Sequence, residues 1–226
     1  MKILAIDAST EVCSCALYMD GKVQDRSQFA PQKHSKLILP MADELLAEAE
    51  LKLNQLDCLA VGRGPGSFTG LRIACGIVQG IAFGADLPVA SISSLATLAQ
   101  SAYVETGKKQ VLATIDARMG EIYYGYYIAD KQGVMQCQIA EQVAKPNNIE
   151  LLTTEHWYGV GSGWTYAVIL KHKFGNLLQG YQVEKYPQAS NMIPLALSAF
   201  KQGQVVDAEN LSPVYLRDMN KKVNGS

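Results

Sequence analysis

The first third of the chain changes between the hydrophobic period of strands and that of helices. Residues 2–7 form a short apolar run typical of a buried strand, and residues 12–19 alternate small and apolar positions up to an Asp20-Gly21 turn. This pattern predicts antiparallel strands at the start of the fold. The full set predicted for this half is strands over 2–7, 12–19 and 22–29, a helix over 35–50, a strand over 56–61, a helix over 69–84 and a strand over 87–92.

The second half appears as a weaker copy of this order. Ile115-Asp116-Ala117 repeats Ile6-Asp7-Ala8, and a later strand ending in glycines repeats the strand before Gly62. Chance similarity between short apolar strands is the alternative to duplication. The further predicted elements are strands over 112–117, 121–128 and 134–140, helices over 164–171 and 189–201, a strand over 181–186, an extended arm over 212–217 and a loose polar tail over 220–226, with the halves linked near 103–109.

A glycine-rich stretch over residues 60–72 joins a predicted strand to a predicted helix. Ser67 or Thr69 is expected to cap that helix, and the exposed amides of such a junction can hold an anion. The glycines equally suit a tight turn, and the stretch fits neither phosphate-binding glycine motif. In a duplicated fold it would face a cleft with the turns after each first strand. The candidate nucleotide or anion contacts are therefore Asp7, Ser9, Gly64, Gly66, Ser67 and Thr69.

Two helices carry more apolar surface than one sheet can cover. Leu37, Ile38, Met41 and Leu45 contribute to an arc wider than the stripe that a single neighbour needs. In the second helix Gly76, Gly80 and Gly84 recur every four residues, which lets another helix approach closely. Packing within the protein is the alternative, but this pattern favours a partner. The predicted interface residues are Leu37, Ile38, Met41, Leu45, Arg72, Gly76 and Gly80.

Composition and charge narrow the functional class. The 226 residues are 48% hydrophobic with a net charge of −1, and the 20 basic residues are dispersed rather than clustered as in many nucleic-acid-binding proteins. We expect no membrane helix and no secretory signal, which favours the cytoplasm. The 5 cysteines fall mostly in apolar segments and are predicted to be buried thiols.

The expected chemistry is sparse. No Gly-x-Ser-x-Gly elbow is present, and the histidines at 34, 156 and 172 have no evident catalytic partner. His34 begins the first predicted helix, but Ile38 stands one turn later where a second metal-binding histidine would be needed. We therefore predict no catalytic residue and no metal ligand.

Four segments carry a family resemblance. They are Ile6-Asp7-Ala8-Ser9-Thr10, the segment from Gly64 to Arg72, the segment from Asp116 to Tyr123, and Pro213-Val214-Tyr215-Leu216-Arg217. Together they resemble the bacterial TsaB (YeaZ) family along essentially the whole chain. The resemblance implies an α/β, duplicated actin-like, sugar-kinase and Hsp70 (RNase H-like) fold with two βββαβα-type subdomains. Expected boundaries are 1–104 for the subdomain with the partner-binding helices and 105–226 for a smaller one, whose last segment can pack back on the first.

The resemblance also implies a function. Members of the family are non-catalytic partners of the transferase TsaD, a relative with a helix histidine pair, in forming threonylcarbamoyladenosine at position 37 of tRNA. They form homodimers alone, pair with TsaD through their first two helices and are joined by the ATPase TsaE, so tRNA is expected only through the complex. No cofactor is expected, apart from ATP or ADP in that complex. The alternatives are an actin-like ATPase or nucleotide-binding regulator, and a peptidase.

Overall fold

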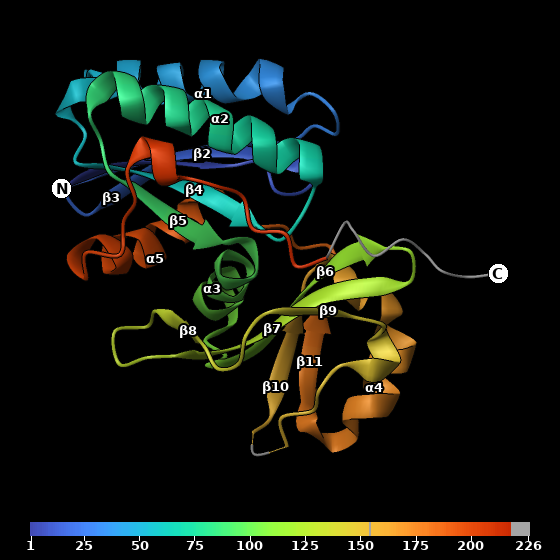
Figure 1. The fold of residues 1–226 in the computed structure, drawn as a ribbon. Coiled ribbons are helices and arrows are strands. Elements are labelled where there is room, and N and C mark those ends of the chain that lie inside the picture. Colours follow the sequence, from blue (N-terminus) through green and yellow to red (C-terminus); the bar gives the residue numbers. More distant parts are fainter. Residues whose placement is uncertain (154, 218–226) are drawn as a thin grey trace.

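The computed structural model describes residues 1–153 and 155–217, which form two mixed β-sheets with helices on their faces (Figure 1). Sheet 1 has the strand order β3-β2-β1-β4-β5, in which β1 to β3 are antiparallel and β4 and β5 run parallel to β1. Its strands are β1 (Lys2–Asp7), β2 (Val12–Met19), β3 (Lys22–Phe29), β4 (Cys58–Gly64) and β5 (Val89–Ser93). The predicted bounds of the first three strands are confirmed.

Sheet 2 repeats this topology. Its order is β11-β10-β6-β7-β8, with the short β9 also paired to β7, and its central strand β6 has antiparallel β7 on one side and parallel β10 on the other. The equivalent strands therefore occupy equivalent places in the two sheets, which confirms the predicted duplication. The strands are β6 (Gln110–Arg118), β7 (Glu121–Ala129), β8 (Met135–Cys137), β9 (Gln142–Ala144), β10 (Trp157–Val160) and β11 (Leu178–Gln182).

The helices are divided among the sheet faces. α1 (His34–Glu48) and α2 (Phe68–Ala85) lie side by side on one face of sheet 1, α3 (Ser94–Thr106) and α5 (Ala189–Lys201) lie on its other side, and α4 (Ala167–Phe174) covers sheet 2 (Figure 1). The structure has no helix equivalent to α1 between β8 and β10 in the part of the chain that it describes. The strand predicted over 134–140 is correspondingly short, and the one predicted over 181–186 lies earlier in the chain.

The sequence pattern did not reveal α3. Its residues from Ser94 to Ala102 are all buried, because the helix lies between the sheets and contacts β6, β7 and α5. A helix surrounded by protein has no polar face and therefore no helical hydrophobic period to read. Ser93 caps it by accepting hydrogen bonds from the amides of Leu95, at 3.1 Å, and Ala96.

The end of the chain returns to sheet 1. α5 packs on β1, β2, β4 and β5, and Ser14 Oγ accepts a hydrogen bond from the Ala189 amide at 2.9 Å. The segment predicted as an arm has no regular secondary structure and runs along both sheets: the Val214 amide donates to the Arg63 carbonyl at 2.8 Å, and Arg217 pairs with Glu121. The predicted polar tail over 220–226 lies outside the described residues.

α2 also bears on the expected absence of a membrane helix. By length and composition it is apolar enough to cross a bilayer, which the sequence reasoning did not anticipate. Core helices of soluble proteins can have the same length and apolar composition. Here the inner side of α2 packs on β4, with Ala74 and Val78 fully buried.

Candidate functional site

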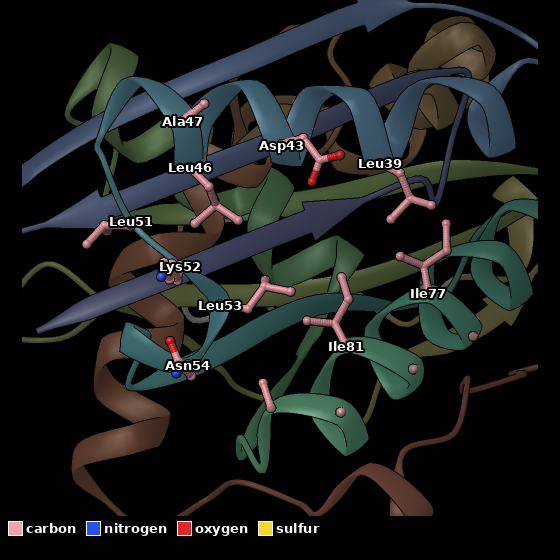
Figure 2. Close-up of a pocket in the computed structure, with 14 residues that line it drawn as sticks. Leu39, Asp43, Leu46, Ala47, Leu51, Lys52, Leu53, Asn54, Ile77 and Ile81 are labelled. Carbon is pink, nitrogen blue, oxygen red and sulfur yellow. The ribbon is translucent and has the colours of Figure 1, made fainter.

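An open apolar groove of about 930 Å³ lies between α1, α2 and the loop after α1 (Figure 2). Leu39 and Ile77 face each other across it from the two helices, and Ile81 faces Leu53. Polar groups are confined to a few positions, including Asp43 and Lys52. The residues that line the groove are Leu39, Asp43, Leu46, Ala47, Leu51, Lys52, Leu53, Asn54, Gly76, Ile77, Gly80, Ile81, Gly84 and Ala85.

The glycines of α2 form one side of this groove. A Cβ built at Gly76, Gly80 or Gly84 would meet no heavy atom within 4 Å, so no neighbour inside the protein requires glycine there. Each glycine nevertheless costs a helix about 1 kcal/mol relative to alanine. The stripe is therefore an open row of small residues along one side of the groove, against which another chain could pack closely.

The structure corrects which residues of α1 can belong to the predicted partner interface. Ile38 and Leu45 are fully buried and Met41 is 9% exposed, and all three face the apolar cluster between α1 and the sheet, so their assignment to a partner interface was wrong. Leu37 is half-buried at the edge of that cluster. The arc looked too wide for one neighbour because α1 packs on both β2 and α2.

The outward residues of α1 are the ones that the sequence reasoning missed. Leu39 is 46% exposed and shares the outer side of the helix with Asp43 and Ala47, which follow at helical spacing. The spacing of these residues by four, on the side of the helix away from the sheet, is the sequence signal that could have identified them. The sequence reasoning also missed Ile77 and Ile81 on α2, each of which follows a stripe glycine by one residue.

Arg72 is exposed but already engaged by the arm. Its guanidinium lies 3.7 Å from the centre of the Phe68 ring, and its Nε donates to Tyr215 Oη at 3.1 Å. The Phe68 and Tyr215 rings are 5.1 Å apart. These contacts fix the arm against the start of α2, and no contact here tests the prediction that Arg72 faces a partner.

A second concavity, the cleft, of about 630 Å³, opens between the two sheets. It brings together Ser9, Gly66 and Ser67 from the first half with Asp116 and Ser162 from the second. Gly64 and Thr69, which were predicted with them, do not line it. Arg118 spans its mouth, pairing with Glu11 at 2.9 Å and with Asp116 at 3.2 Å.

Asp7 does not reach the cleft. Its side chain is fully buried, its Oδ1 accepts hydrogen bonds from the Ser9 amide and hydroxyl, and its Oδ2 has no partner among the described residues. Burial raises the pKa of Asp7 to about 6. The proposed contact of Asp7 with a nucleotide is therefore corrected: the carboxylate points inward, against Gly62.

The glycine junction is explained by close packing. A Cβ at Gly66 would lie 2.1 Å from the Ser9 carbonyl oxygen, and the Ser67 amide donates to that same oxygen at 2.7 Å. Ser67 is the N-cap of α2, accepting from the Gly70 amide at 3.3 Å. The junction thus pins α2 to the turn after β1, and one of the amides considered for an anion is already bonded.

The histidine at the start of α1 is a structural residue. His34 is buried, and its Nε2 lies 2.9 Å from the Thr10 carbonyl oxygen. Across residues 1–153 and 155–217, no three His, Cys, Asp or Glu side chains are grouped as a metal site. In the same residues no histidine hydrogen-bonds to a serine, threonine or cysteine side chain.

The topology and the two concavities define a class: a duplicated actin-like α/β protein. The family model of TsaD, tRNA N6-adenosine threonylcarbamoyltransferase, matches residues 27–220. The chain is 43% identical to the tRNA threonylcarbamoyladenosine biosynthesis protein TsaB of Escherichia coli, over 96% of this chain and 95% of that one, and 41% identical to its Haemophilus influenzae counterpart, over 96% and 94%. The solved structure of YeaZ from Pseudomonas aeruginosa is similar with a TM-score of 0.89, at 41% identity over 95% of this chain and 99% of that chain. The chain belongs to the TsaB (YeaZ) family.

Proposed function

We propose that this chain is a non-catalytic accessory subunit in tRNA threonylcarbamoyladenosine biosynthesis and that it docks onto TsaD through the groove between α1 and α2. The single observation that carries the docking is the unfilled glycine stripe of α2 beside exposed Leu39. The names of its relatives and its match to the TsaD family model support the pathway.

The groove suits a helix of the partner. Small residues spaced by four let helix backbones approach closely, and the neighbouring Ile77 and Ile81 provide ridges on α2. A soluble protein that keeps such an apolar surface open usually covers it with a partner. When TsaD is absent, a second copy of this chain covers the groove. TsaE adds to the helical bundle that this chain forms with TsaD.

The absence of catalysis is supported by the way potential catalytic groups are used. Asp7 is enclosed, His34 bonds to a carbonyl, and Arg118 in the cleft is paired with two carboxylates. A solved structure from Pseudomonas aeruginosa is described as similar to a peptidase, but in the residues described here no serine or cysteine side chain is hydrogen-bonded to a histidine or a lysine, and the serines that bond to carboxylates, Ser9 and Ser93, are buried. In this proposal the chain works in the cytoplasm, and it contacts tRNA and ATP or ADP only as part of the complex with TsaD.

Co-purification with tagged TsaD tests the docking. Leu39→Glu and Gly80→Glu put a carboxylate into the groove without meeting a neighbour at Gly80, and we expect both to abolish the complex. Val168→Glu is the matched control, because Val168 is an 85% exposed apolar residue on α4 outside the groove. An unchanged complex with both groove variants would refute the interface.

Calorimetry on the isolated chain separates this proposal from the ATPase alternative. The cleft contains Ser9 and Ser67, so a nucleotide-binding protein would show saturable heat with ATP and magnesium. We expect no binding at about millimolar nucleotide, corresponding to less than about 4 kcal/mol of binding free energy. Tight binding by the chain alone would favour the alternative.

A further inference from the structure

A third concavity, the side pocket, of about 770 Å³, lies where β5, β8, the end of α5 and the arm meet. Its apolar lining includes Ile92, Met135, Leu195, Val206 and Val214. Two charged side chains also line it, Arg63 at the end of β4 and Glu141 just before β9. Neither the docking groove nor the cleft uses these residues.

Arg63 is an arginine without a partner among the described residues. The arginines at 26, 118 and 217 pair with carboxylates, and Arg72 bonds to Tyr215. Arg63 is half-buried, and its Nε is shielded from solvent with no acceptor in the described chain. A guanidinium carries five donors in a rigid fork that matches a carboxylate, and leaving the buried Nε donor unbonded is costly. Arg63 is therefore the side chain of this pocket to which an anionic group would bind.

Glu141 supplies the opposite charge in a fixed position. Its Oε1 accepts hydrogen bonds from the hydroxyls of Ser93 and Tyr127, both of which are buried. Burial raises the pKa of Tyr127 well above its ordinary value, so the phenol remains a donor. The other oxygen, Oε2, has no partner among the described residues and can accept from a cation.

The two charges do not neutralise each other. No nitrogen of Arg63 lies within 4.0 Å of a carboxylate oxygen in the described residues, although Arg63 and Glu141 line the same pocket. A ligand that carries both a negative and a positive group would satisfy both side chains at once. An apolar substituent on that ligand would contact Leu195 and Val206.

We propose that the side pocket binds a free α-amino acid with an apolar side chain, its carboxylate on Arg63 and its ammonium on Glu141. This site is independent of the docking groove, so it stands or fails separately from the proposed function.

Calorimetric titration of the full chain with L-leucine tests the site. We expect saturable one-to-one binding with a Kd below about 1 mM, which corresponds to about 4 kcal/mol. The matched ligands are 4-methylpentanoate, which lacks the ammonium, and 3-methylbutylamine, which lacks the carboxylate. Each is expected to bind about 10-fold more weakly or worse, the usual effect of losing a charged hydrogen bond.

Two variants test the assigned contacts. Arg63→Met removes the guanidinium, and Glu141→Gln removes the charge while keeping an oxygen for Ser93 and Tyr127; each should weaken L-leucine about 10-fold or more. Arg26→Met, at a surface ion pair outside the pocket, should leave it unchanged. Absence of saturable L-leucine binding, equal binding of all three ligands, or unchanged affinity in Glu141→Gln would each overturn the proposal.

Discussion

Replacing stripe glycines by alanine should make the isolated chain more stable and its complex weaker. Gly76 and Gly80 lie within α2 at ordinary helical dihedrals, and a Cβ at either meets nothing within 4 Å. Each substitution should therefore recover about 1 kcal/mol of helix propensity, or about 2 kcal/mol for the pair. For a chain of this size that corresponds to a rise in Tm of about 4 to 8 °C.

Gly70→Ala is the matched control on the same helix. Its Cβ would lie 2.0 Å from the Ala8 carbonyl oxygen, so the same gain in propensity is outweighed by a clash, and we expect a lower Tm. Thermal unfolding followed by circular dichroism, at concentrations where sedimentation shows a monomer, gives the stability. Affinity for TsaD, measured by calorimetry, should fall in Gly76→Ala/Gly80→Ala. A lower Tm for that monomeric double variant would refute the reasoning, because it would mean that the stripe is already filled.

Three further predictions concern other parts of the molecule. Because burial raises the pKa of Asp7 from 3.8 to about 6, its neutral form stabilises the fold at low pH, and about 3 kcal/mol of this is lost as pH rises between those values; urea unfolding of Asp7→Asn should lack that loss, and parallel pH curves would contradict it. Gly66→Ala should cost about 1–3 kcal/mol or more in urea unfolding, because its Cβ would overlap the Ser9 carbonyl, and a neutral result would contradict the packing role of the junction. Arg217→Met should cost about 1 kcal/mol or less, since its ion pair with Glu121 is partly exposed, but should speed amide exchange in the turn after β6; unchanged exchange would show that the arm does not hold that turn.

Most strands and helices were predictable from sequence because their signals are local. β1 is a short apolar run, β2 alternates small and apolar residues up to the Asp20-Gly21 turn, and α5 has a clear amphipathic period. The bounds of β1 to β3 and of α5 were predicted without error. α3 was not accessible, because burial on all sides removes the period. The short β9 has too few residues to carry one.

The candidate interface was predictable only as a pair of helices. Helical spacing identifies an apolar arc on α1 but not which part of it the sheet covers, and Ile38 and Leu45 were assigned outward for that reason. The glycine stripe was clearer, since glycine inside a helix costs stability wherever it faces. The side pocket joins Arg63 to Glu141 from separate segments, a proximity that only the folded chain shows.

A reconstituted modification reaction shows whether the groove between α1 and α2 is needed to form threonylcarbamoyladenosine. TsaD, TsaE, tRNA and the threonylcarbamoyl donor would be combined without this chain, with the wild type, with Leu39→Glu, or with Val168→Glu. We expect threonylcarbamoyladenosine only with the wild type and Val168→Glu, because only these keep the groove of α1 and α2 apolar. Full modification without the chain, or with Leu39→Glu at the wild-type rate, would contradict it.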